Sequence, residues 1–239
     1  MANYNAYGAS VGPVTGQIDV GLRAHMNKVY GLMALAMLVT GGVAYGVGTN
    51  IALLSAISHG PLRYVVMFAP LVVVFGFSAM INRLSVAAAQ GVFYLFAALM
   101  GLSLSYIFAV YTGVSIAQTF LVTAITFAGL SLYGYTTKRD LSGMGTFFMM
   151  GLIGLLVAMV VNMFLHSAAI TFATSAIGVL LFAGLTAYDT QNIKATYVQM
   201  AQSGDREWLG KSAIMGALSL YLDFLNMFMF LLQFMGNRN

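Results

Sequence analysis

An aspartate stands in the middle of the last apolar segment of this 239-residue chain. Asp223 is the twelfth of 24 residues from Ser212 to Met235, and no other residue of that segment is charged. An ionised carboxylate at the centre of a membrane span costs about 2.5–3.5 kcal/mol, so such a residue is a functional candidate when it has a partner. Asn226, three residues on, shares its helical face and is a possible hydrogen-bond donor. A span with a central aspartate should face the interior of a bundle.

A second aspartate, Asp189, ends the preceding apolar segment. Two carboxylates close together in a low dielectric cannot both ionise cheaply, so they share a proton and respond to pH. Without protons they offer hard oxygen ligands to Ca²⁺, but Ca²⁺ takes about six to eight oxygens, so two carboxylates hold it weakly and transiently. We therefore predict that Asp189 and Asp223 form a pH sensor on an ion pathway. A solvated carboxylate at a helix end is the alternative interpretation of Asp189.

Arg83 is a third charged candidate. It ends the second apolar segment, on the same predicted side of the membrane as Asp189. We predict that Arg83 pairs with Asp189 when both are charged, as a latch that protonation of the aspartate weakens. The alternative is an ordinary anchor at the cytoplasmic interface.

The composition places these residues in a membrane protein. Hydrophobic residues make up 60% of the chain and charged residues 7%, against about a quarter charged in a soluble domain. A soluble domain of this size has no interior large enough for so much apolar surface. We therefore exclude a water-soluble enzyme, a nucleic-acid-binding protein and a disordered regulator. The net charge of +4 comes from scattered Lys and Arg, so the expected surroundings are the lipid bilayer, with no nucleic acid partner.

Charged residues divide the chain into segments that are long enough to span a bilayer. A span needs about 20 residues. Residues 84–137 and 141–188 are each long enough for two spans, with turns expected at 111–113 and 166–167. The further spans are expected at 29–47, 64–81 and 212–235. The segments are apolar on every face, which favours helices over strands. We predict an all-α polytopic membrane protein, a seven-transmembrane-helix bundle with the last helix central.

Small residues are spaced to let these helices approach closely. Gly42 and Gly46 lie four apart, and Ala97, Gly101 and Ser105 form a similar row. Such faces allow tight helix packing in lipid. We predict that they pack inside one bundle.

The positive charges predict the orientation of the spans. With a cytoplasmic N-terminus, eight Lys and Arg residues lie inside and two outside, which satisfies the positive-inside rule. The inside residues are Arg23, Lys28, Arg83, Lys138, Arg139, Lys194, Arg206 and Lys211, and the outside ones are Arg63 and Arg238. We expect residues 1–24 to form a flexible cytoplasmic tail and residues 25–239 a single transmembrane domain.

The sequence shows neither catalytic machinery nor a cofactor site. An intramembrane serine protease needs a His or Lys base at membrane depth, and no span core carries one. A retinal protein needs a lysine inside the last helix, whereas Lys211 precedes it. Cysteines and a phosphate-binding GK[ST] loop are absent. We expect no enzyme activity and no cofactor, with Ca²⁺ only as a permeant ion.

From about Arg23 to its end the chain resembles the Bax inhibitor-1 (transmembrane Bax inhibitor motif) family. The resemblance rests on three stretches, Ala187-Tyr188-Asp189-Thr190-Gln191, Leu220-Tyr221-Leu222-Asp223-Phe224-Leu225-Asn226 and Gly101-Leu102-Ser103-Leu104-Ser105. It implies a seven-helix protein that acts as a pH-sensitive Ca²⁺ leak channel. In that picture Asp189 and Asp223 are the sensor at the pore, and Arg83, by position, latches the closed state. The short loops are typical of a bacterial inner-membrane protein.

Together these observations predict a membrane protein that leaks Ca²⁺ and is gated by protonation of the Asp189–Asp223 pair. One alternative is a proton-coupled secondary transporter with Asp223 as its proton carrier. Another is a non-conducting regulator that binds a membrane protease or another membrane protein through the tail and the loop at 190–212.

Overall fold

The computed structural model describes residues 11–201 and 205–239, and these residues are almost entirely helical. Nine α-helices and two short 3₁₀ helices are found in these two ranges. In chain order they are α1 (Val11–Gly48), α2 (Ile51–Ser58), α3 (Leu62–Met80), η1 (Ile81–Arg83), α4 (Val86–Leu104), α5 (Ile107–Val110), α6 (Gly113–Thr136), η2 (Ser142–Met144), α7 (Gly145–Leu165), α8 (Ala168–Met200) and α9 (Arg206–Met235).

Seven helices of the described residues are long and apolar enough to cross a membrane, which confirms the predicted all-α fold and its span count. They are α1, α3, α4, α6, α7, α8 and α9. Both predicted turns are also confirmed. The chain leaves α5 at Val110 and enters α6 at Gly113, and α7 ends before His166, whose φ of 51° reverses the chain toward α8.

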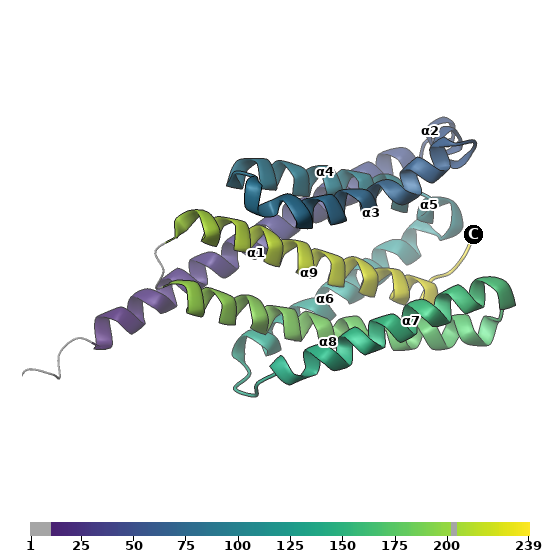
Figure 1. Cartoon of the computed structure of the whole chain (residues 1–239). Helices are drawn as coiled ribbons and strands as arrows, with labels where there is room; N and C mark the ends of the chain where they lie inside the picture. Colours follow the sequence, from purple (N-terminus) through teal and green to yellow (C-terminus); the bar gives the residue numbers. More distant parts are fainter. Residues whose placement is uncertain (1–10, 202–204) are drawn as a thin grey trace, which may run out of the picture.

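Helix α9 runs through the middle of the bundle, as predicted. It lies between the α3–α4 pair and the α7–α8 pair (Figure 1) and packs against α8, α1, α6 and α4. In its most apolar stretch 67% of the residues are buried, against 11% in α3 and in α7. The core is therefore built around α9, and its Ala213, Ile214, Ala217 and Leu220 are completely buried.

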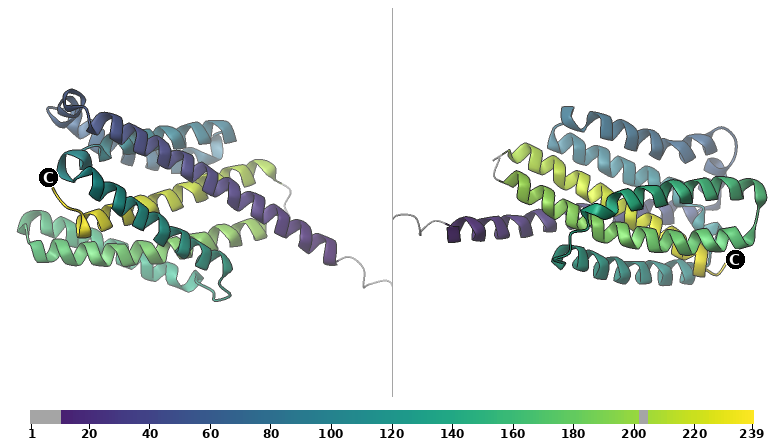
Figure 2. Two further views of the ribbon diagram at one scale, coloured as in Figure 1. Left: turned by 180° about the vertical axis from the view of Figure 1, so that it is seen from behind. Right: turned by 60° about the horizontal axis from the view of Figure 1, so that its bottom comes forward.

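Helix α1 begins well before the expected end of the N-terminal tail. The helix runs from Val11, whereas the tail was predicted to reach residue 24; residues 1–10 lie outside the described residues. Leu22, Met26 and Val29 are buried at helical spacing, so the helix is held by packing earlier than the first fully apolar segment suggests. The first turns of α1 project beyond the rest of the bundle (Figure 2).

Polar caps start most of the helices where the chain re-enters the bundle. The side chain of Thr112 accepts a hydrogen bond from the Ser115 amide at the start of α6, and Ser167 does the same for α8. At the start of α9 the Asp205 carboxylate accepts from the Trp208 amide at 2.9 Å. Such caps satisfy amide groups that have no partner within the helix.

One of the two predicted small-residue faces is a packing face. Ala97, Gly101 and Ser105 of α4 are buried against α1, and a methyl group on Gly101 would come within 2.6 Å of the Thr40 carbonyl oxygen. The prediction for Gly42 and Gly46 is wrong. Both are exposed, and no atom lies within 4 Å of where a side chain would begin; Gly42 lines an open pocket between α1, α6 and α9.

The last residues of the chain form a clip on the turn between α5 and α6. The Thr112 amide donates to the Asn237 carbonyl at 3.1 Å, and the Asn239 amide donates to the Val110 carbonyl at 3.0 Å. The Asn237 amide also donates to the Ser115 hydroxyl at 2.9 Å. These bonds fasten the C-terminal end of α9 to a neighbouring helix pair.

Candidate functional site

Asp189 and Asp223 face each other across the α8–α9 contact, the most extensive helix–helix contact in the bundle. Their carboxyl groups lie within interaction range of each other, close enough to share a proton. A carboxylate is only an acceptor, so a hydrogen bond between the two groups requires one proton on the pair. Asp223 is 5% exposed and Asp189 is half-buried. The structure thus brings together the two aspartates that the sequence singled out.

The pair lies at one end of a cavity of about 520 Å³ between α7, α8 and α9. Helix α7 packs along α8 and makes little contact with α9, so a gap stays open on that side of the pair. The polar end of the cavity consists of Asp189, Ser219, Asp223 and Asn226. The rest of the lining is apolar: Met149, Leu152, Ile153, Leu155, Leu156, Met159, Phe182, Leu185, Leu222 and Phe230.

Within the described residues no protein cation neutralises the carboxyl pair. Among the described side chains the one ion pair joins Lys211 to Glu207 at 2.9 Å, one helical turn apart on α9. The second oxygen of Asp223, Oδ2, is buried and has no hydrogen-bond partner. Leaving a buried carboxyl oxygen without a partner is costly.

Asn226 shares the cavity but does not support Asp223 in the way that the sequence suggested. Its Nδ2 donates to the carbonyl oxygen of Leu222 at 2.8 Å, four residues back on the same helix. This local bond uses one of the two N–H donors of the amide, and the structure has no hydrogen bond from Asn226 to Asp223. Asn226 is therefore a polar residue of the cavity wall, and the Asp223 carboxyl is left with Asp189 as its partner.

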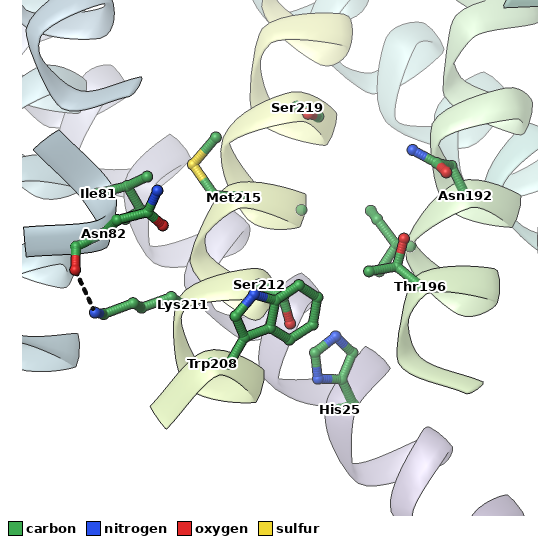
Figure 3. Close-up of a pocket in the computed structure, with 12 residues that line it drawn as sticks. His25, Ile81, Asn82, Asn192, Thr196, Trp208, Lys211, Ser212, Met215 and Ser219 are labelled. Atoms are coloured by element: carbon green, nitrogen blue, oxygen red, sulfur yellow. Dashed lines mark hydrogen bonds between the residues drawn. The ribbon is translucent and has the colours of Figure 1, made fainter. Parts of the chain in front are cut away.

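A second cavity, of about 300 Å³, approaches the pair from the end of the bundle where α8 and α9 are connected. Figure 3 shows His25 and Trp208 at one end of it and Ser219 at the other. Ser219 also lines the aspartate cavity, so the two cavities share it as a common wall. Asn192, one turn of α8 beyond Asp189, contributes an amide to this approach.

Arg83 lies at the same end of the bundle but does not reach the aspartates. It ends η1 and is exposed, and it forms no ion pair among the described side chains. Ile81 and Asn82 of η1 line the second cavity instead, and the Asn82 carbonyl oxygen accepts a hydrogen bond from the Lys211 ammonium at 3.3 Å. The predicted contact between Arg83 and Asp189 is therefore absent from this structure.

Sequence reasoning overlooked Ser219 and Asn192, although their spacing held a signal. Ser219 precedes Asp223 by four residues and Asn192 follows Asp189 by three, so each shares a helical face with its aspartate. His25 and Trp208 come from helices far apart in the chain and carry no such signal.

The site has few groups that could hold a metal ion. Within the described residues no three His, Asp or Glu side chains lie together. A cation at the pair would have to complete its coordination with water and with hydroxyl or amide oxygens such as those of Ser219 and Asn226. A site with so few charged ligands suits passage of a cation better than its retention.

Fold and site together define a polytopic membrane protein with an internal carboxyl pair between its central helix α9 and the neighbouring α8. Residues 22–239 match the profile of the family described as inhibitor of apoptosis-promoting Bax1, so the chain belongs to the Bax inhibitor family. A protein of Rickettsia prowazekii, RP147, is 45% identical over 92% of both chains. A protein of Caulobacter vibrioides is 45% identical over 92% of this chain and 90% of its own. The inner membrane protein YbhL of Escherichia coli K12 is 46% identical over 93% of this chain and 95% of its own.

Proposed function

We propose that this protein is a pH-sensitive, calcium-permeable leak channel, in which protonation of the Asp189–Asp223 pair controls passage of the ion. The observation that carries the proposal is a pair of neighbouring carboxyl groups, one buried on the central helix α9 and one half-buried on α8, with no cationic partner among the described side chains. Protonated, the pair offers Ca²⁺ little charge; deprotonated, it offers two hard carboxylates. The proposal includes no catalytic activity and no cofactor.

The two cavities support a route through the bundle. One reaches from the α8–α9 connection to Ser219, and the other contains the aspartates on the far side of that residue. In this structure Ser219 and its neighbours separate them. Opening requires α9 to move relative to α8 by enough to join the cavities at Ser219.

The setting of the proposal is a bacterial inner membrane with the N-terminus in the cytoplasm. The relatives named above are bacterial, and the one from E. coli is called an inner membrane protein. The excess of Lys and Arg on one side favours this orientation. The cavity at the α8–α9 connection then opens to the cytoplasm, and Lys211 and Asn82 lie at its cytoplasmic end.

The test is Ca²⁺ flux into proteoliposomes across a pH series, with wild type compared with Asp189→Asn and Asp223→Asn. We expect a flux that titrates with pH in wild type and a flat profile in both variants. The matched control is Asp140→Asn. Asp140 is an exposed carboxylate between α6 and α7 whose Oδ1 accepts from the Ser142 amide, a bond that an Asn retains. Its pH profile should match that of wild type.

The same measurement separates the alternatives. Flux that saturates, together with proton movement driven by a substrate gradient, would replace the leak channel with a proton-coupled transporter. Absence of protein-dependent Ca²⁺ flux at every pH, with folded protein in the vesicles, would refute conduction. It would leave a regulator that binds other membrane proteins, whose function should survive Asp223→Asn.

A further inference from the structure

The aspartate cavity opens sideways, toward the hydrocarbon of the bilayer. Its α7 wall includes Met149, Ile153 and Leu156, which are 57–60% exposed on the outer surface of the bundle. Its inner wall is formed by Leu155, Phe182 and Phe230, each 5–7% exposed. The cavity is therefore a cleft that runs from the lipid-facing surface to the carboxyl pair. A molecule dissolved in the membrane can reach it without crossing the aqueous ends.

The two ends of this cleft have opposite chemistry. Ten apolar side chains line most of it, whereas the inner end presents the carboxyl groups of Asp189 and Asp223. Because Asp223 is 95% buried and no protein cation pairs with it in the described part of the chain, its carboxyl group is a strong acceptor in a low dielectric. A pair that shares one proton also carries one negative charge. The inner end therefore favours a cationic hydrogen-bond donor.

We propose that this cleft binds a lipophilic amine, a protonated ammonium group on an alkyl or aryl chain. The ammonium donates to the carboxyl groups of Asp189 and Asp223, and the chain fills the apolar part between α7 and α9. The volume of about 520 Å³ lies within the range of about 300–1,000 Å³ that is usual for small-molecule sites. The negative charge of the carboxyl pair repels the phosphate of a phospholipid headgroup. A neutral alcohol has no positive charge and therefore binds the pair more weakly than an ammonium group. This inference rests on the carboxyl pair of the proposed function but not on ion conduction.

The test is photolabelling of the full-length protein in detergent with a decylamine that carries a diazirine on its chain, followed by peptide mass spectrometry. We expect adducts on the stretches 149–159 and 222–230. The matched probe is the alcohol of the same chain, which should label these stretches about tenfold less, since it lacks the charge-assisted hydrogen bond. Equal labelling by both probes, or adducts spread over the outer face of α3, would overturn the proposal.

Two variants locate the binding site. Asp223→Asn should lower amine labelling by about tenfold without changing the alcohol. Leu156→Trp, in the cleft wall, should obstruct the chain and lower labelling, whereas Val157→Trp should not. Val157 is 57% exposed on α7 and Leu156 60%, but only Leu156 lines the cleft, so the pair separates occlusion from a general effect on the helix. Labelling that is equal in both Trp variants, with both still monodisperse, would refute the site.

This experiment distinguishes failure of the amine site from failure of the proposed ion conduction. Labelling is measured without an ion gradient, so specific adducts with no Ca²⁺ flux would uphold the amine site and refute conduction. A pH-dependent flux with no specific adducts would do the reverse.

Discussion

Tyr221 and Asp223 are polar residues of α9 that lie two positions apart and have opposite surroundings in the bundle. Tyr221 is completely buried toward α1 and α4, where its hydroxyl lies 2.6 Å from Thr40 Oγ1 and its ring meets Phe93 and Phe96 edge-on. Thr40 in turn donates to the Ala97 carbonyl at 2.8 Å, so the Tyr221 hydroxyl must donate to Thr40. Asp223 faces α7 and α8 with a free oxygen and an open cleft beside it.

This difference distinguishes polar side chains that hold the helices together from polar side chains that are available for function. On the Tyr221 side the hydrogen bonds are completed and no space remains, so that side holds helices together. On the Asp223 side a buried oxygen is left without a partner, a cost that packing does not recover. We infer that the α1–α4–α9 side is the rigid frame and that the α7–α8–α9 side is the working part. Four predictions test this division.

The largest effect on stability is expected from Tyr221→Ala. Removing a large, completely buried ring costs on the order of 3 kcal/mol or more, because its aromatic neighbours lose their contacts and a cavity remains. Unfolding in mixed micelles with increasing SDS measures this loss. A loss below about 1 kcal/mol would show that this side is not a tightly packed frame.

Replacing a glycine by alanine should also affect stability differently on the α1–α4–α9 side and on the α7–α8–α9 side. Gly101→Ala on α4 places it against the Thr40 carbonyl and Val43, and we expect a cost of about 1–3 kcal/mol. Gly154→Ala on α7 meets nothing within 4 Å and should be neutral or stabilising by up to about 1 kcal/mol. The same SDS titration gives both values. Equal effects would contradict the division.

Thr40→Val tests the hydrogen-bonded link directly. It removes the acceptor of the Tyr221 hydroxyl and the donor to Ala97, so we expect a loss of about 1–3 kcal/mol. Tyr221→Phe leaves the Thr40–Ala97 bond intact and should cost about 1 kcal/mol. A double-mutant cycle measures the coupling between the two residues. Independent effects would mean that the chain of bonds contributes nothing beyond its parts.

The smallest stability effect is expected at the site itself. Asp223→Asn relieves a buried charge and should change the free energy of unfolding by less than about 1 kcal/mol, even though it abolishes the pH dependence of flux. Thermal unfolding in detergent, measured beside the flux assay, gives both quantities for one preparation. A large loss of stability would make Asp223 a structural residue like Tyr221.

Much of this architecture could be predicted from the sequence, because charges are costly inside a bilayer and mark the ends of spans. The turns near Thr112 and His166 and the central position of α9 follow from that rule and from Asp223 alone. The faces of the helices could not be predicted, since segments that are apolar all round carry no periodicity to show which side turns inward. Hence the sequence predicted a helix–helix contact for Gly42 and an ion pair with Asp189 for Arg83, and the structure contains neither. The cleft depends on how far α7 stands from α9, which no local pattern records.

The clip at the C-terminal end gives α9 the mechanics of a lever. Residues 237–239 are hydrogen-bonded to the turn between α5 and α6, so this end of α9 is held in place. If the helix tilts about this fixed end, each residue moves in proportion to its distance from the clip. Ser219 lies farther along the arm than Asp223, and Lys211 farther still. A tilt of α9 that moves the aspartates slightly would therefore move the N-terminal end of the helix, near Lys211, by more. A fluorophore near Lys211 would report that motion, whereas one on Asn239 would sit at the pivot and disturb it.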